Sequence, residues 1–145
     1  MENVVPTIAV LIIESNKVLL VKHKEAAKHL TGTYGLPSGR LEKGETEKEA
    51  SIRELLEETG LRTKKEDLVE FPNNLYIATL ERKGGSFVKF SWKVLLCINY
   101  NGDIKESDET IPQWVEVSKL NSLNLLPNIE NAVEAGLEHT KNSKL

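Results

Sequence analysis

Apolar residues are grouped along the chain into short runs, and the first two runs predict β-strands. Residues 7–15 (TIAVLIIES) and 17–23 (KVLLVKH) are rich in β-branched side chains, with the polar stretch ESNK at their junction. Such runs, bounded by turn-forming residues, are typical of strands, so the pattern predicts a hairpin of two strands. Residues 24–39 contain three glycines and a proline and are predicted to be mostly loop.

The second half of the chain is also rich in predicted strands. Residues 67–104 read as two or three strands, and residues 113–120 (QWVEVSKL) as another short strand that leads into a turn. Two pairs of residues supply candidate hairpin turns, namely Gly84 with Gly85 and Asn101 with Gly102.

Two stretches have the periodicity of amphipathic helices. Residues 46–59 predict a central helix, and residues 128–145 predict a terminal helix in which Ile129, Val133 and Leu137 share one face. Strands on both sides of one central helix, followed by a terminal helix, favour an α/β fold in which helices cover both faces of a mixed sheet.

The ends of the central helix are well specified by local rules. Thr46 is the expected N-cap, and Glu49 three positions later completes a capping box. Gly60 supplies the left-handed position after the helix, where Leu61 is expected to pack back on Leu56.

Three glutamates crowd the last turns of this helix. At 100° per residue, Glu54, Glu57 and Glu58 share one face. The opposite face is apolar and is expected to point into the core, and it holds Ile52, Leu55, Leu56 and Thr59. Each acid in the last turn opposes the helix dipole at a cost of roughly 0.3–1 kcal/mol, and Arg53 can pair with Glu57 but cannot neutralise three anions. The simpler interpretation of these three glutamates is an acidic helix face exposed to solvent. The alternative is a binding site for a hard divalent cation, Mg²⁺ or Mn²⁺, which clustered carboxylates suit.

Composition narrows the classes of function. The chain has 145 residues, which suits a single domain spanning 1–145. Charged residues make up 28% of the chain, and its net charge is −3. This negative charge argues against a nucleic-acid binder with a broad basic face. Cys97 is the only cysteine and lies in an apolar run, so we expect a buried thiol and no disulfide. No apolar run approaches the roughly 20 residues that span a bilayer, and the first residues lack the basic start of a signal peptide, so a cytoplasmic protein is expected.

At this point the sequence resembles the signature of the Nudix hydrolases. That signature is Gly, five residues, Glu, seven residues, then Arg-Glu-aliphatic-x-Glu-Glu-x-Gly-aliphatic. Every fixed position is matched within residues 39–61, by Gly39, Glu45, Arg53, Glu54, Leu55, Glu57, Glu58, Gly60 and Leu61. The preceding YGLPSG is similar to the lead-in of the family, except that Ser38 stands where many members have glycine.

The resemblance implies an α/β/α sandwich around a mixed sheet and an enzyme that uses Mg²⁺ or Mn²⁺ to hydrolyse a nucleoside diphosphate linked to another group. It implies metal ligands at Glu57 and Glu58 and at the backbone carbonyl of Gly39. Glu54 is then a ligand, the general base, or both. Arg53 is expected to orient a glutamate through an ion pair, and Glu45 to close the preceding loop onto the helix.

Residues outside the signature are candidates for further roles. Several members of the family use a second acid far downstream, and Glu109, five residues before Trp114, fits that arrangement better than Glu106 or Asp108; it is a candidate ligand or base. Four residues are candidates for contacts with the substrate: Lys22, His23, Lys24 and Tyr34. Phe90 and Trp92 are candidates for stacking on a base, although core packing is the simpler interpretation for these residues, as it is for Trp114.

The likeness leaves the substrate open. A (d)NTP or modified (d)NTP, as for MutT-type members that clean the nucleotide pool, is favoured by the short chain. Dinucleotide polyphosphates and nucleotide sugars such as ADP-ribose are alternatives; the tyrosine at position 76 and the nearest proline at 72 weaken ADP-ribose. A nucleotide sensor without turnover and an acidic docking face are further alternatives. The expected partner is a small nucleotide, with no nucleic acid polymer and no membrane, and a homodimer is possible.

Overall fold

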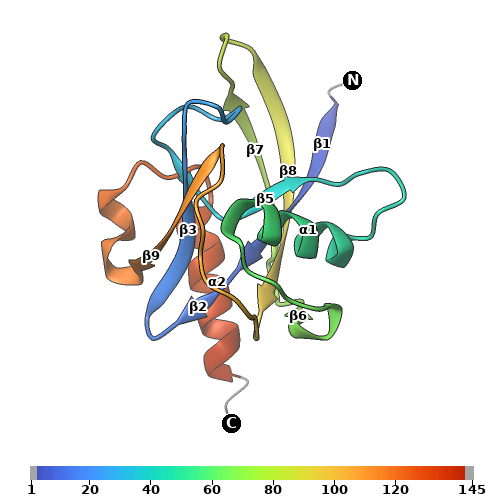
Figure 1. Ribbon diagram of the computed structural model, residues 1–145, viewed down its shortest axis with the longest axis vertical. Helices are drawn as coiled ribbons and strands as arrows, with labels where there is room; N and C mark the ends of the chain where they lie inside the picture. The colour runs from blue at the N-terminus through green and yellow to red at the C-terminus, as the bar shows by residue number, and fades with distance from the viewer. Residues whose placement is uncertain (1–2, 143–145) are drawn as a thin grey trace.

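The structure is a computed structural model that describes residues 3–142 as a mixed α/β fold (Figure 1). The strands are β1 (Val4–Leu11), β2 (Ile13–Glu14), β3 (Lys17–His23), β4 (Tyr34–Gly35), β5 (Ser38–Arg40), β6 (Leu68–Val69), β7 (Leu75–Glu81), β8 (Phe87–Cys97) and β9 (Thr110–Glu116). The α-helices are α1 (Glu47–Thr59) and α2 (Ile129–Asn142), with short 3₁₀ turns at Lys65–Asp67 and Val117–Ser122.

The strands form two sheets. In the five-stranded sheet the order is β5-β1-β8-β6, and β7 also pairs with β8; the pair β1 and β8 is parallel and every other pair is antiparallel. In the four-stranded sheet β3 pairs with β2, β4 and β9, in each case antiparallel. The first of these is the mixed sheet that the sequence predicts.

The two helices lie on opposite faces of β1, α1 in front and α2 behind in Figure 1. Side chains alternate between the faces of a strand, and Leu11 packs in the core cluster that includes Val133 of α2. The neighbouring Val10 packs in the cluster that includes Leu55 of α1. Both faces of the strand are therefore buried, which explains its nearly unbroken apolar run and confirms the expectation of helices on both faces.

The predicted hairpin between the first two strands is wrong for most of its length. Only Ile13 and Glu14 pair with β3, through a turn in which Ser15 and Asn16 have positive φ values of 52° and 63°. The rest of the first run is β1, which pairs along all eight of its residues with β8. The two edges of β1 are occupied by β5 and β8, and the ladder with β8 is eight residue pairs long.

The other turns and elements agree with the sequence in all but one case. Gly84 and Gly85, with φ values of 95° and 89°, form the turn between β7 and β8 as expected. Asn101 and Gly102 do not start a hairpin strand, because Asn101 exchanges both backbone hydrogen bonds with Arg62 just after α1. The strand at β9 is confirmed, and so is the terminal helix α2 as far as Asn142; residues 143–145 of the predicted helix lie outside the described residues.

Helix α1 begins and ends where the local rules place its ends. The Thr46 hydroxyl accepts from the Glu49 N–H at 3.1 Å, and the Glu49 carboxylate accepts from the Thr46 N–H at 2.9 Å. Gly60 adopts φ 83° and donates to the Leu56 carbonyl. One detail differs: Leu56 is 37% exposed, and Leu61 packs in the cluster with Leu55 in place of the predicted contact with Leu56.

Two further expectations concern burial and the membrane. Cys97 is buried, 4% exposed, at the end of β8, as predicted. Among residues 3–142, neither helix has the length and apolar character needed to cross a lipid bilayer. Trp114 packs against the cluster on the α1 side, close to the ring of Tyr100, so core packing is its role in the fold.

Candidate active site

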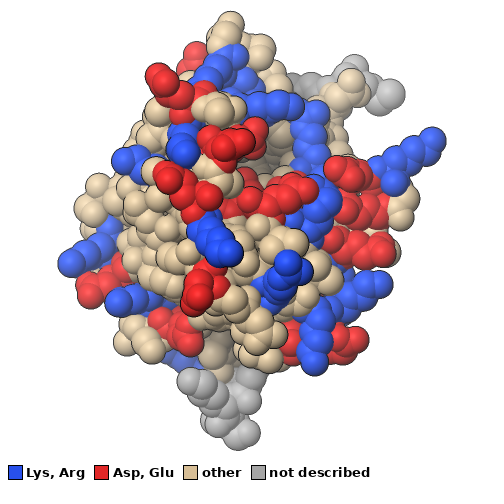
Figure 2. Space-filling view, viewed as in Figure 1, with Lys and Arg blue, Asp and Glu red and all other residues tan. Residues whose placement is uncertain are grey.

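A cavity of about 470 Å³ opens where the end of α1 meets β5, β8 and the start of β9. Figure 2 shows a hollow on this face, with acidic side chains along one part of its rim and basic side chains along another. The lining residues that bear charge or can carry it are Glu42, Glu54, Glu58, Glu109, Arg40, Arg53, Arg82, Lys28, His23 and His29. The cavity thus brings together residues from the signature and residues far from it in the chain.

The three glutamates at the end of α1 do not lie alike. Glu54 and Glu58 line the cavity, whereas the Glu57 side chain is 58% exposed. The last turn of the helix contains no basic residue, so the unfavourable interaction with the helix dipole has no compensation within the helix.

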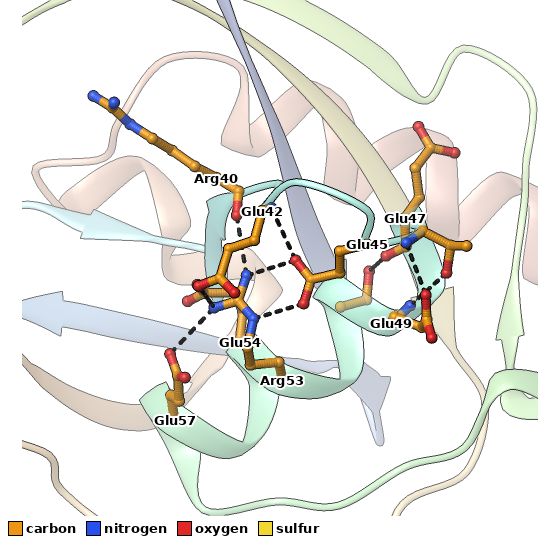
Figure 3. A network of polar contacts seen from close by, with 10 residues as sticks. Arg40, Glu42, Glu45, Glu47, Glu49, Arg53, Glu54 and Glu57 are labelled. Atoms are coloured by element: carbon orange, nitrogen blue, oxygen red, sulfur yellow. Dashed lines mark hydrogen bonds and ion pairs between the residues drawn. The ribbon is translucent and has the colours of Figure 1, made fainter.

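Arg53 joins the helix to the loop before it (Figure 3). Its Nε and one terminal nitrogen donate to the carboxylate of Glu45 at 2.7 and 2.9 Å, and its other terminal nitrogen donates to Glu54 at 2.6 Å. Weaker contacts run to Glu57, at 3.4 Å, and to the carbonyl of Arg40. These contacts form the network that the sequence predicts for Arg53, and Glu45 closes the loop onto the helix.

Charge within this network is strongly stabilised. Hydrogen bonds from Arg53, and one from the Glu42 N–H, lower the pKa of Glu45 to about 2. The same contacts, those of Glu45 first, raise the pKa of Arg53. Arg53 and Glu45 therefore remain ionised at every pH at which the protein is expected to work, and they hold the loop of β5 rigidly against α1.

Gly39 allows the carboxylate of Glu54 to approach the backbone of β5. A Cβ atom placed on Gly39 would lie 2.2 Å from both Cδ and Oε1 of Glu54, well inside van der Waals contact. Only glycine fits at this position while Glu54 keeps its place. The signature glycine thus has a steric reason that is independent of any role for its carbonyl.

Glu58 is the most perturbed acid in the cavity. Its carboxylate accepts a hydrogen bond from the Ser38 N–H at 2.7 Å. Burial raises its pKa to about 8, and the nearby charges of Glu54, Glu109 and Glu57 add to the effect, while the bond from Ser38 opposes it. Burial also raises the pKa of Glu54, against the hydrogen bond from Arg53. Negative charge is therefore unfavourable on this wall without a cation.

The start of β9 brings Glu109 to the same wall. The Thr110 hydroxyl donates to the carbonyl of Glu58 at 2.9 Å, which holds the start of β9 at the end of α1. Glu109 lines the cavity and is close enough to raise the pKa of Glu58. Of the three downstream acids considered from sequence, Glu109 alone lines the cavity, whereas Glu106 pairs with Lys24.

The acids suit a divalent metal ion by their chemistry. Several carboxylates, crowded and partly desolvated, are the donor set that Mg²⁺ and Mn²⁺ prefer. Within residues 3–142, however, no three Asp, Glu, His or Cys side chains are arranged to share one ion as they stand. Arg53 holds Glu54, Ser38 holds Glu58, and Glu57 extends outward. The predicted ligands are thus neighbours on one wall that do not converge on a point.

The four candidate substrate residues are dispersed. His23 lines the cavity, 4% exposed, with Nδ1 2.9 Å from the Thr33 carbonyl, and burial lowers its pKa. Lys22 lies over the ring of Tyr34, and neither residue lines the cavity. Lys24 donates to the carbonyl of Ser107. Of the four, only His23 is placed in the cavity.

The wall opposite the acids consists of residues that the sequence did not single out as a group. Arg40 and Arg82 lie over the ring of Phe90, which is 2% exposed, and His29 lies beside the same ring. In the sequence, the glycine pair after Arg82 indicates only a turn. The residues of this wall share no spacing motif, so no sequence pattern predicts that they lie together. Trp92 also lines the cavity and packs partly against the α2 side of the core.

The fold is thus a mixed sheet between two helices, with a carboxylate-rich cavity at the end of one of them. Residues 4–135 match the family model described as the NUDIX domain. The chain therefore belongs to the Nudix family, as its signature indicated.

Relatives with assigned names support this membership. The chain is 37% identical over 102 residues to human 8-oxo-dGDP phosphatase NUDT18, a match that covers 70% of this chain and 27% of that protein. It is 31% identical over 111 residues to the oxidized purine nucleoside triphosphate hydrolase of Danio rerio, covering 77% of this chain and 65% of that protein. The chain thus spans about a quarter of the length of the NUDT18 proteins of human and mouse.

Solved structures show the same fold. A MutT NUDIX hydrolase from Burkholderia pseudomallei superposes with a TM-score of 0.73 at 21% identity, covering 92% of this chain and 98% of that one. The MutT protein from Methanosarcina mazei Go1 gives 0.72 at 23% identity, covering 99% and 98%. At these identities the likeness supports the fold alone.

Proposed function

We propose that this protein hydrolyses a pyrophosphate bond in a (d)NTP or an oxidised (d)NTP, in a reaction that depends on Mg²⁺ or Mn²⁺. The observation that carries the proposal is the acidic wall: Glu58, with its pKa raised to about 8, beside Glu54 and Glu109 in a cavity of about 470 Å³. A cluster of this kind is destabilising unless a cation joins it. The names of the relatives, which concern oxidised purine nucleotides, support the substrate class.

The side chains of Glu54, Glu57 and Glu58, with the carbonyl of Gly39, would hold the metal. When bound, a divalent ion supplies neutralisation of the phosphate charge and a lower pKa for water. Its binding would require Glu54 and Glu57 to turn toward Glu58, which their single contacts to Arg53 permit.

The residues of the chain then handle the proton. A water oxygen forms a bond to phosphorus, the bridging P–O bond breaks, and the leaving phosphate keeps the electron pair. The proton of the water passes to a carboxylate, for which Glu54 and Glu109 are the two candidates on the wall. Before the metal binds, Arg53 orients Glu54 through the hydrogen bond of 2.6 Å, and Arg53 remains charged throughout. A Glu109→Gln variant that keeps most of kcat would assign the base to Glu54.

A second candidate function is a nucleotide sensor that binds without turnover. The specific observation in its favour is that no three metal-ligating side chains within residues 3–142 are arranged to share an ion. A sensor, however, has no need of Glu54, Glu57 and Glu58 together.

A panel of nucleotides incubated with Mg²⁺ tests the proposal. Products are identified by ³¹P NMR, in ¹⁸O-labelled water to locate the phosphorus attacked. We expect release of pyrophosphate or phosphate from at least one nucleoside triphosphate, loss of turnover in Glu57→Gln, and full activity in Glu47→Gln, an exposed acid at the other end of α1. Binding without any product would favour the sensor, and retained activity in Glu57→Gln would refute the ligand assignment.

A further inference from the structure

The wall opposite the acids carries two arginines over one buried ring. The guanidinium carbon of Arg82 lies 5.2 Å from the centre of the Phe90 ring, and that of Arg40 lies 5.8 Å from it. Both arginines line the cavity. They come from different parts of the fold, Arg40 from the end of β5 and Arg82 from the turn after β7, so the fold itself brings their charges together.

Neither arginine has a carboxylate partner among residues 3–142 at ion-pair distance. Burial lowers the pKa of Arg82, and the charge of Arg40 adds to that effect. Arg53, in the same cavity, contrasts with them because it contacts four glutamates. Arg53 is paired with the glutamates of the acidic wall, whereas Arg40 and Arg82 on the opposite wall have no neutralising anion.

Arg82 is held in place before any ligand arrives. Its guanidinium donates to Nδ1 of His29 at 3.3 Å, which requires an unprotonated acceptor, and burial lowers the pKa of His29 to about 3. The next residue, Lys83, donates to the carbonyls of Lys24 and Glu25, which fastens the turn to the loop that carries His29. The neutral histidine orients the arginine without competing for its charge.

We propose that Arg40 and Arg82 bind the terminal phosphate of a nucleoside triphosphate while the acids and their metal act on the bond nearer the nucleoside. Phe90 is 2% exposed and lies beneath both guanidinium groups, so it offers no free face for a base to stack on. A ligand at this wall therefore meets guanidinium donors, which match phosphate oxygens in charge and geometry.

This inference rests on the proposed function and sharpens it. Beyond the broken bond a triphosphate has two phosphates, whereas a diphosphate has only one, and a nucleotide sugar has a neutral group in place of the second. The two arginines would therefore determine preference for triphosphates over diphosphates and nucleotide sugars. Their contribution is to positioning and affinity, separate from the chemistry on the acidic wall.

The test compares 8-oxo-dGTP, 8-oxo-dGDP and ADP-ribose at saturating Mg²⁺. The first two differ only in the terminal phosphate. We expect Arg82→Gln and Arg40→Gln each to lower kcat/KM for the triphosphate at least tenfold and to change the other two substrates less than threefold. Arg62→Gln, an exposed arginine outside the cavity lining, serves as the matched control and should leave all three unchanged. An equal loss for all three substrates, or no loss for the triphosphate, would overturn the proposal.

A binding measurement separates this inference from the proposed function. Calorimetric titration of inorganic tripolyphosphate with Mg²⁺ present should give an affinity at least tenfold weaker in Arg82→Gln than in wild type, with unchanged melting temperature. If wild type turns over no nucleotide but this difference holds, the proposed function fails and the arginine subsite stands. If both proteins bind tripolyphosphate equally, the subsite is refuted even when turnover is present.

Discussion

Single residues determine the charge of each wall of the cavity. Arg53 forms hydrogen bonds with Glu45 and Glu54, whereas burial raises the pKa of Glu58 to about 8, because the hydrogen bond from the Ser38 N–H does not offset it. The acidic wall is therefore only partly neutralised by the protein. Such incomplete compensation in a cavity is typical of a ligand site rather than of a structural ion-pair network.

Replacing Gly39 by alanine should damage the site more than the fold. The added Cβ would lie 2.2 Å from the Glu54 carboxylate and displace it, so we expect a loss of kcat on the order of 100-fold. Gly35→Ala is the comparison, because its Cβ would meet the flexible end of Leu126 at 3.0 Å and would lie at an ordinary contact distance of 3.5 Å from Cε1 of His23. Steady-state kinetics and circular dichroism measure the two effects. Full activity in Gly39→Ala would refute the proposed role of Glu54.

His29 should make the folded state sensitive to acid. Its pKa is lowered to about 3 in the folded protein from an ordinary 6.5, so the unfolded chain binds the proton first as the pH falls. Its stabilising contribution is present in full above pH 6.5 and is lost as the pH falls toward 3. Between pH 7 and pH 5 we expect a decrease of about 1 to 2 kcal/mol in the free energy of unfolding from this group.

Chemical denaturation across this pH range measures that decrease. In His29→Gln the amide oxygen can still accept from Arg82, and the pH dependence should be flatter than in wild type. Parallel curves for wild type and His29→Gln would contradict the neutral state of this histidine in the folded protein.

At the scale of elements, the sequence predicts what local rules determine. Helix α1 was predictable to the residue because its N-cap, capping box and left-handed glycine all lie within the segment itself. The partner of β1 was not, because an apolar run buried on both faces does not reveal which strand lies beside it. The same difference applies to the site. The proximity of Glu54, Glu57 and Glu58 was predictable because they share one helix, whereas Arg40 and Arg82 come together only in the folded sheet.

The caps of α1 give a prediction at this scale. Thr46→Ala removes the acceptor for the Glu49 N–H and should lower the free energy of unfolding by about 1 kcal/mol. Thr46→Ser keeps the hydroxyl and should be close to wild type. Denaturation by urea measures both variants. Equal stabilities would mean that packing, rather than the cap, determines where the helix begins.

At the scale of the whole molecule, the two helices share β1 as their common support. Leu11 packs toward α2 and Val10 toward α1, so a change on one side of the strand is transmitted to both layers. The packing of α2 against β1 is close at Gly136, where a Cβ would lie 2.3 Å from Cδ2 of Leu11. Glycine in mid-helix is explained by this close approach.

Gly136→Ala should destabilise the protein although alanine favours helix. We expect a loss of about 1 to 3 kcal/mol from overpacking against Leu11, larger than the gain of about 1 kcal/mol in helix propensity. Glu134→Ala, exposed on the same helix, should change stability little. In a double-mutant cycle with Leu11→Ala, the alanine at 136 should cease to be harmful. Additive effects would exclude the steric contact as the cause.

Strand β8 has a consequence for any redesign of this molecule. Phe90 and Trp92 face the cavity, and on the same side of the strand Val94 continues into the core beneath α2. Inserting or deleting one amino acid between Trp92 and Val94 would move Phe90 and Trp92 to the other side of the strand relative to Val94, away from the cavity. Variants with a new substrate preference should therefore carry substitutions on this strand without a change in its length. Insertions and deletions should be tolerated only in the turn around Gly84.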